Sequence, residues 1–221
     1  MTSPRTIADR VAEMHATAAA TPSDAPASAF RREQATLAAR GLPPGIAAAG
    51  NFVPDTELLD PFGAPTTLYA MTGNGASVVV FYRGAWCPYC NIALATYRAH
   101  LLPQLTERDV RLIAISPQKP DGSLSMQQKH DLDFAVVSDP GNVVARYLGI
   151  LTQPSEEARA AQLQLGLDLT SVNADGTITL PMPATLILDG DHLVRWIDVH
   201  PDYSGRTEPE QILQALDQAR L

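Results

Sequence analysis

Cysteine is scarce in this chain, with only two among 221 residues, at positions 87 and 90. Secreted domains built on a disulfide framework need more cysteines at wider spacing, which argues against that class. A structural zinc site needs about four ligands, and the five histidines are scattered without ligand spacing. The sequence therefore predicts no metal site, and we expect no bound cofactor.

Long apolar stretches and surplus positive charge are also missing. The longest apolar run, near Val78 to Tyr82, has the length of a strand and not the roughly 20 residues of a membrane helix. The first 30 residues contain charged side chains where a secretory signal needs an unbroken apolar core. The net charge of −8 repels nucleic acid and anionic lipid. We expect a soluble, cytoplasmic protein that binds neither nucleic acid nor membranes.

The chain divides near residue 48 into an N-terminal helical arm and one larger domain. Apolar residues at helical spacing predict a helix over residues 6–17 of the arm. An Ala/Pro/Ser-rich linker over residues 18–28 follows, and a second helix is expected over residues 30–40. The apolar stripe of the arm needs a partner surface, so packing or dimerisation is the plainer interpretation and substrate gating is the alternative.

Residues 49–221 alternate short apolar runs with helical segments, which is typical of an α/β fold. Near-continuous apolar runs at residues 78–81 and 112–115 predict central strands that are buried on both faces. The expected strands are 77–82, 110–116, 135–138, 185–189 and 193–199. The expected helices are 87–102, 125–132, 143–148 and 209–221, and a helical excursion is expected over 153–168.

One segment joins a buried strand to a helix through a short turn and places Cys87-Pro88-Tyr89-Cys90 at the start of that helix. Residues three apart share a helical face, so Cys90 can form a disulfide with Cys87. Free backbone N–H groups at a helix N-terminus favour a thiolate, so we expect the pKa of Cys87 to lie below that of an ordinary cysteine. The motif predicts an exposed attacking thiol at Cys87 and a shielded resolving thiol at Cys90.

Other interpretations of the cysteine pair stay open. Two buried, unreactive cysteines are the default for an arbitrary pair, and a zinc site would need further ligands. An iron–sulfur cluster shared across a dimer would use a similar motif, as some glutaredoxin-like proteins do. The strand, turn and helix around the pair and the preceding Trp86 favour redox chemistry.

Several further segments match one known family; they are residues 50–55, 81–82, 113–116, 138–139, 147–150, 183–189 and 205–206. In these segments the chain resembles the peroxiredoxins, the AhpC/TSA (alkyl hydroperoxide reductase/thiol-specific antioxidant) branch of the thioredoxin superfamily. The CPYC motif itself is similar to those of thioredoxins and glutaredoxins. The resemblance implies a thioredoxin-like α/β fold for residues 49–221, with a central mixed β-sheet flanked by helices.

Two features of the family are missing. Peroxiredoxins carry Thr or Ser three residues before the reactive cysteine, whereas this chain has Gly84 there. The family arginine that holds the peroxide would fall near residues 183–184, where no arginine occurs. Arg83, Arg195 and Arg206 are therefore the candidates to replace it.

The resemblance also predicts which residues bind substrate. Pro183 stands where thioredoxin-like folds usually have a cis-proline beside the active site, so we expect a cis Met182–Pro183 bond facing Cys87. Trp86 precedes the reactive cysteine and borders the same turn. We therefore expect Pro183, Trp86 and Arg83 to form the substrate-binding surface.

Two activities compete for this site. In the first, a thiol-dependent peroxidase, Cys87 attacks a hydroperoxide, becomes a sulfenic acid and forms a disulfide with Cys90. A thioredoxin-like protein or a low-molecular-weight thiol then reduces that disulfide. The alternative is a glutaredoxin-like thiol–disulfide reductase that acts on protein or mixed disulfides through the same pair. A redox sensor whose disulfide alters the arm is a third, non-enzymatic reading, and a homodimer is expected by analogy.

Overall fold

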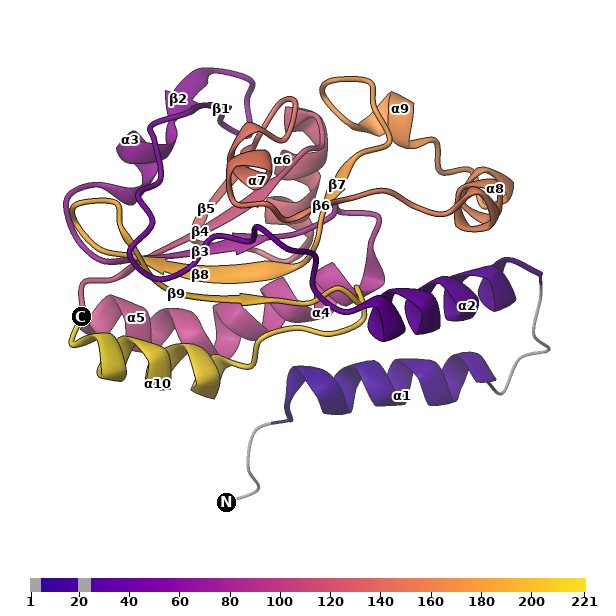
Figure 1. The fold of residues 1–221 in the computed structure, drawn as a ribbon, viewed down its shortest axis with the longest axis horizontal. Helices are drawn as coiled ribbons and strands as arrows, with labels where there is room; N and C mark the ends of the chain where they lie inside the picture. Colours follow the sequence, from indigo (N-terminus) through magenta and orange to yellow (C-terminus); the bar gives the residue numbers. More distant parts are fainter. Residues whose placement is uncertain (1–4, 20–24) are drawn as a thin grey trace.

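A seven-stranded mixed sheet forms the centre of the computed structural model, which describes residues 5–19 and 25–221 (Figure 1). β3 pairs in parallel with β4 and antiparallel with β8, so the predicted mixed sheet is confirmed. The strand order is β2 (Pro65–Thr67), β1 (Glu57–Leu59), β5 (Ala135–Ser138), β4 (Arg111–Ser116), β3 (Ser77–Phe81), β8 (Ala184–Leu188) and β9 (Val194–Val199).

The central strand β3 is buried on both faces, as its apolar run predicts. Successive side chains of a strand point to opposite faces. Val78 and Val80 accordingly belong to one hydrophobic core, and Val79 and Phe81 to the other. β3 thus fixes the position of the turn that carries Cys87.

Helices cover both faces of this sheet (Figure 1). On one face a long helical stretch packs beside α10 (Pro209–Ala219); the stretch consists of α4 (Pro88–Thr96), the π-helical turn η1 (Tyr97–Leu101) and α5 (Leu102–Glu107). On the other face lie α3 (Leu68–Thr72) and α7 (Val143–Tyr147). The helix that begins at the cysteine motif therefore runs past the predicted end at residue 102, to Glu107.

The elements that the sequence missed are short, and one predicted helix begins earlier than expected, at a proline. α6 (Pro120–Lys129) starts five residues before the predicted 125, since Pro120 suits the first helical position. Elements of two to four residues carry too few side chains for a period to be recognised. Besides β1 and β2, these are β6 (Leu151–Thr152), β7 (Leu180–Pro181) and α9 (Leu169–Val172).

The N-terminal arm packs against its own domain. α1 (Ile7–Ala19) buries Ile7 and Val11 in the core that contains α4 and α10. The Glu208 carboxylate accepts hydrogen bonds from the N–H groups of Ile7 and Ala8, both at 2.9 Å. The predicted linker over residues 18–28 is shorter than expected, because residues 18–19 and 25–28 are helical; residues 20–24 lie outside the described part of the chain.

The second arm helix, α2 (Ala25–Arg40), packs against α8 (Glu156–Gln164), the predicted helical excursion. Glu33 accepts a hydrogen bond from the backbone N–H of Ser155 at 2.6 Å. Arg32 and Glu157 form an exposed ion pair at 2.9 Å, which contributes little to stability. α2 and α8 lie at the end of the molecule where α4 begins (Figure 1).

The expected cis bond at Pro183 is wrong, because no peptide bond within residues 5–19 and 25–221 is cis. The backbone N–H of Met182 donates to Ile150 O at 2.7 Å, and Pro183 O accepts from His200 N at 2.8 Å. These bonds hold the chain extended between β7 and β8. The trans form is also favoured by about 0.5–1 kcal/mol in X–Pro bonds generally.

A buried carboxylate caps α7. Asp139 is 1% exposed and accepts hydrogen bonds from the N–H groups of Val143 at 2.7 Å and Val144 at 3.0 Å. Burial outweighs these bonds and raises the pKa of Asp139 to about 6. Between about pH 4, where the unfolded side chain ionises, and this raised value, the folded chain keeps a proton that the unfolded chain has released. The free energy of unfolding therefore falls as pH rises through this window.

Replacing Asp139 with asparagine should remove this pH dependence, because the amide keeps an acceptor oxygen and does not ionise. The expected change is at most about 3 kcal/mol between the two ends of the window, since each pKa unit corresponds to about 1.4 kcal/mol. Urea unfolding of both proteins as a function of pH measures it. The exposed Asp191→Asn variant is the control, and an undiminished slope in Asp139→Asn would contradict the assignment.

Candidate active site

The cysteine motif lies at the turn between β3 and α4. Cys87 is the N-cap residue of α4, with φ −86° and ψ 113°, and Pro88 occupies the first helical turn. Cys87 N donates to Gly84 O at 3.1 Å, which closes the turn. Both thiols are buried, with Cys87 1% and Cys90 0% exposed, so the expectation of an exposed thiol at Cys87 is wrong and that of a shielded thiol at Cys90 is confirmed.

Arg206, from the loop before α10, contacts both sulfurs. Its Nη2 atom lies 3.0 Å from Cys90 Sγ and 3.9 Å from Cys87 Sγ. Cys90 Sγ also accepts a hydrogen bond from the backbone N–H of Arg83 at 3.4 Å. The Arg206 guanidinium is held in place by the carbonyl oxygens of Tyr203 and Gly205. Two donors, one of them charged, therefore converge on Cys90.

The expectation that the pKa of Cys87 is lowered is wrong. Burial, followed by the hydrogen bond to Cys90 and its negative charge, raises the pKa of Cys87 well above its ordinary value. Burial opposes ionisation of Cys90 too, but the hydrogen bond from Cys87 and the charge of Arg206 outweigh it and hold the pKa of Cys90 well below its ordinary value. The position of Arg206, closer to Cys90 than to Cys87, thus favours the negative charge of the pair on Cys90.

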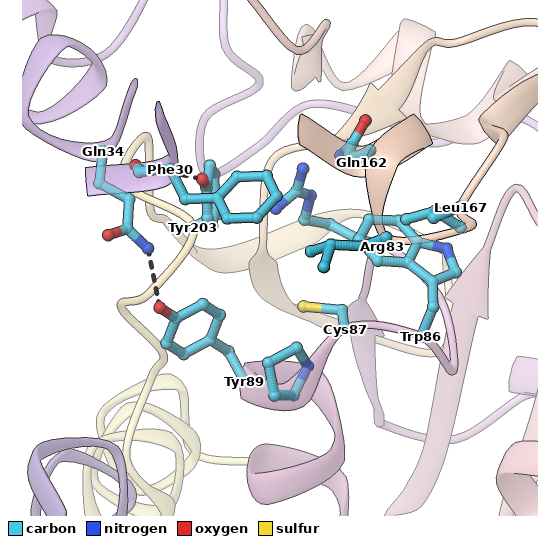
Figure 2. Close-up of a pocket in the computed structure, with 11 residues that line it drawn as sticks. Phe30, Gln34, Arg83, Trp86, Cys87, Tyr89, Gln162, Leu167 and Tyr203 are labelled. Atoms are coloured by element: carbon cyan, nitrogen blue, oxygen red, sulfur yellow. Dashed lines mark hydrogen bonds between the residues drawn. The ribbon is translucent and has the colours of Figure 1, made fainter. Parts of the chain in front are cut away.

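A cavity of about 350 Å³ opens in front of Cys87 (Figure 2). The Cys87 sulfur points into this space, whereas Cys90 is not among the lining residues. Most lining groups are aromatic or aliphatic, as is usual for sites that bind organic molecules. They are Phe30, Gln34, Arg83, Trp86, Cys87, Pro88, Tyr89, Gln162, Leu165, Leu167 and Tyr203.

Arg83 forms part of the cavity wall and is only 4% exposed. Its guanidinium carbon lies 3.9 Å from the centroid of the Tyr203 ring and 5.1 Å from that of Trp86. Both distances are within the range of cation–π attraction. Its Nε atom is buried and has no hydrogen-bond partner within the described ranges.

One side chain from each of the two arm helices contacts the hydroxyl of Tyr89. Gln34 Nε2 donates to this hydroxyl at 2.9 Å, and His15 Nε2 lies 2.9 Å from it (Figure 2 shows the Gln34 bond). The rings of His15 and Tyr89 are also in edge-to-face contact, with centroids 5.6 Å apart. Since Tyr89 lies between the two cysteines, the arm is attached directly to the active turn.

Of the predicted substrate-binding residues, the structure brings Arg83 and Trp86 to the cavity with Cys87 but leaves Pro183 out. Pro183 is buried at the start of β8. Of the other arginine candidates, Arg206 reaches the sulfurs, whereas Arg195 is exposed and contacts Asp189 at 3.4 Å. Sequence reasoning missed the cavity residues from α2, α8 and the segments after them, because no local pattern marks them.

Packing explains why glycine replaces the hydroxyl residue at position 84. A Cβ atom on Gly84 would overlap Nε1 of Trp86 and lie 2.8 Å from Gln118 Oε1. The φ angle of +152° also favours glycine. The Trp86 indole thus occupies the space that a Thr or Ser side chain would need.

Comparison with known proteins identifies the family. Residues 49–197 match the model of the AhpC/TSA family. The chain belongs to the AhpC/TSA family. The predicted resemblance is thereby confirmed, and this AhpC/TSA protein is a thiol-dependent peroxidase.

Solved peroxiredoxin structures share the fold of this AhpC/TSA protein. Peroxidoxin BcpB from Mycobacterium tuberculosis is 21% identical, with coverage of 78% of this chain and 96% of that chain and a TM-score of 0.57. Reduced Prx3 of Vibrio vulnificus, solved with H2O2, is 17% identical, with coverage of 77% and 99% and a TM-score of 0.62. Peroxiredoxin 6 of Arenicola marina is 18% identical, with coverage of 79% and 74% and a TM-score of 0.61. Among curated protein sequences, none matches the chain.

Two kinds of feature are absent from the described residues of this AhpC/TSA protein. Within residues 5–19 and 25–221, no helix is both long and apolar enough to cross a membrane. The same residues contain no cluster of three or more His, Cys, Asp or Glu side chains placed to bind a metal ion.

Proposed function

We propose that the chain reduces hydroperoxides at Cys87 and that Cys90 resolves the product as an intramolecular disulfide. The observation that carries this proposal is the unequal placement of the two sulfurs. Cys87 Sγ faces the cavity, while Cys90 Sγ lies behind it at 3.0 Å from Arg206. The sulfur that lines the cavity is thus placed to meet substrate, and the sulfur behind it is placed to capture the product.

The first step needs a thiolate on Cys87, and Cys90 supplies the base that forms it. In the resting pair Cys87 carries the proton and Cys90 the negative charge. As Cys87 attacks the terminal peroxide oxygen, its proton moves to the Cys90 sulfur. The O–O bond breaks, Cys87 becomes a sulfenic acid, and the leaving alkoxide takes the proton from Cys90 and departs as the alcohol.

The second step uses the negative charge that the first step leaves on Cys90. Beside Arg206, Cys90 is again a thiolate and attacks the Cys87 sulfur. The S–S bond forms, and hydroxide leaves and takes a proton from solvent to become water. Two electrons have then passed from the two sulfurs to the peroxide.

The cavity supports an organic hydroperoxide as substrate, because Phe30, Leu165 and Leu167 offer apolar surface to a carbon chain. Trp86 and Arg83 bind this molecule in our proposal. A thioredoxin-like protein or a low-molecular-weight thiol returns the electrons at the Cys87 sulfur. A cytoplasmic location, where thiols are kept reduced, fits a two-cysteine chain of this kind.

A direct comparison tests the activity. Reduced protein is mixed with one equivalent of cumene hydroperoxide or of a model disulfide, and the loss of thiols is followed in time. We expect faster loss with the hydroperoxide and none in the Cys87→Ser variant. Faster reaction with the disulfide would instead identify a thiol–disulfide reductase.

A further inference from the structure

Arg83 is a buried cation whose charge acts on the two cysteines but whose guanidinium forms no direct ion pair within the described residues. Within residues 5–19 and 25–221 its guanidinium makes neither an ion pair nor a hydrogen bond, and its Nε atom is fully buried. Buried charges in proteins are almost always paired, because an unpaired one has lost its hydration without replacement. Because this guanidinium lies on the wall of a cavity, we infer that its counter-ion is a bound ligand.

The surroundings of Arg83 define the shape of that partner. The rings of Tyr203 and Trp86 lie near the guanidinium at 3.9 and 5.1 Å, and stacking of this kind leaves the planar edge with its N–H donors for a ligand. Such an edge binds carboxylates through two parallel hydrogen bonds. The rest of the wall is largely apolar, so the remainder of the partner is hydrocarbon.

Among the described residues, no other charged side chain that we find at the cavity is free to bind a carboxylate. Arg206, the other buried arginine at the site, is occupied by Cys90 and by two backbone carbonyls. Glu33 is a buried acidic residue of α2. It does not line the cavity, and one of its oxygens is bound by Ser155 N.

We propose that the cavity binds an amphipathic carboxylate, and that the substrate is a hydroperoxide with a hydrocarbon body whose carboxylate pairs with Arg83. The proposal rests on the peroxidase function proposed above. Both Arg83 and the Cys87 sulfur line the same cavity of about 350 Å³, so one molecule can reach both (Figure 2). A carboxylate could also come from a thiol reductant, but small polar thiols leave the apolar wall uncovered.

Binding is measured first, with a ligand that cannot react. Trp86 lies beside Arg83, so its fluorescence reports on the cavity, and a Trp196→Phe background removes the other tryptophan. We expect decanoate to bind at least about 10-fold more tightly than decanol, because a charge-assisted hydrogen bond is worth about that much. Arg83→Met should abolish the difference, whereas the matched surface variant Arg195→Met should keep it.

Equal binding of decanoate and decanol by the unmutated cavity would overturn the proposal, whether or not Arg83→Met folds. Arg83→Lys keeps the charge but loses the two parallel donors, so it should retain only part of the preference. A full preference in Arg83→Met would likewise assign the carboxylate to another group.

Kinetics then test the substrate itself. A hydroperoxy fatty acid is compared with its methyl ester and with hydrogen peroxide. We expect Arg83→Met to raise KM for the acid by at least about 10-fold more than it raises KM for the ester or for hydrogen peroxide. An equal loss for all three would place Arg83 at the peroxide group instead, and an effect confined to a carboxylated thiol reductant would move the site to the reductant. If the protein reduces no hydroperoxide yet binds decanoate through Arg83, the peroxidase function fails and the carboxylate site stands.

Discussion

Replacing Arg206 with methionine is expected to slow the reaction of the reduced protein with hydroperoxide by about 100-fold at neutral pH, since a nearby opposite charge shifts a pKa by roughly 1–3 units. Without the guanidinium at 3.0 Å, the Cys90 sulfur keeps its proton. The pair then has neither a thiolate nor a base for Cys87. Single-turnover rates as a function of pH measure the effect, and the profile should move to higher pH.

Two further variants serve as controls for the loss of the Arg206 charge. Arg206→Lys retains the positive charge and should recover part of the rate, whereas Arg195→Met removes an arginine that contacts neither sulfur and should behave as the unmodified protein. Thiolate absorbance in the ultraviolet gives a second readout that does not depend on turnover. An unchanged profile in Arg206→Met would mean that the cation does not set the ionisation of the pair.

Replacing Cys90 with serine should stop the reaction at the sulfenic acid. The first step should be slower, because Cys90 is also its base, but it should not be lost, because removing Cys90 removes a neighbouring charge that helps to raise the pKa of Cys87. Turnover with a dithiol reductant should fall by at least about 100-fold, because an intramolecular attack is replaced by a bimolecular one. Intact mass after one equivalent of peroxide, with dimedone as a trap for sulfenic acid, follows both events.

Cys87→Ser is the matched control and should trap no sulfenic acid at all. If Cys90→Ser turns over at the normal rate through a disulfide between two chains, the resolving thiol belongs to another molecule. If it accumulates no sulfenic acid on Cys87, the order of the two cysteines is reversed.

Local patterns allowed much of the fold to be predicted. The apolar runs that became β3 and β4 are buried on both faces, and such runs are readable from the residues alone. Cys87 was recognised for the same reason, because the strand, the turn and Pro88 adjoin it in sequence. β6 and β7, at two residues each, have no period to detect.

The electrostatics of the site could not be derived in the same way. Arg206 is 116 residues from Cys90 in sequence, and nothing near either residue distinguishes it from Arg83 or Arg195. Its contact reverses the expected order of acidity, since helix position alone favours Cys87. The cavity walls from α2 and α8 likewise depend on tertiary packing, so the sequence indicated the reactive sulfur but not the size or character of the space before it.

The cap on α1 has a consequence for biosynthesis. Glu208 follows Ile7 by 201 residues, so α1 is synthesised long before the carboxylate that caps it. Arg206 belongs to the same late segment. During synthesis the CPYC turn therefore emerges before its cation, and the cysteine pair gains the contact that favours its ionisation only after Arg206 has folded back onto Cys90.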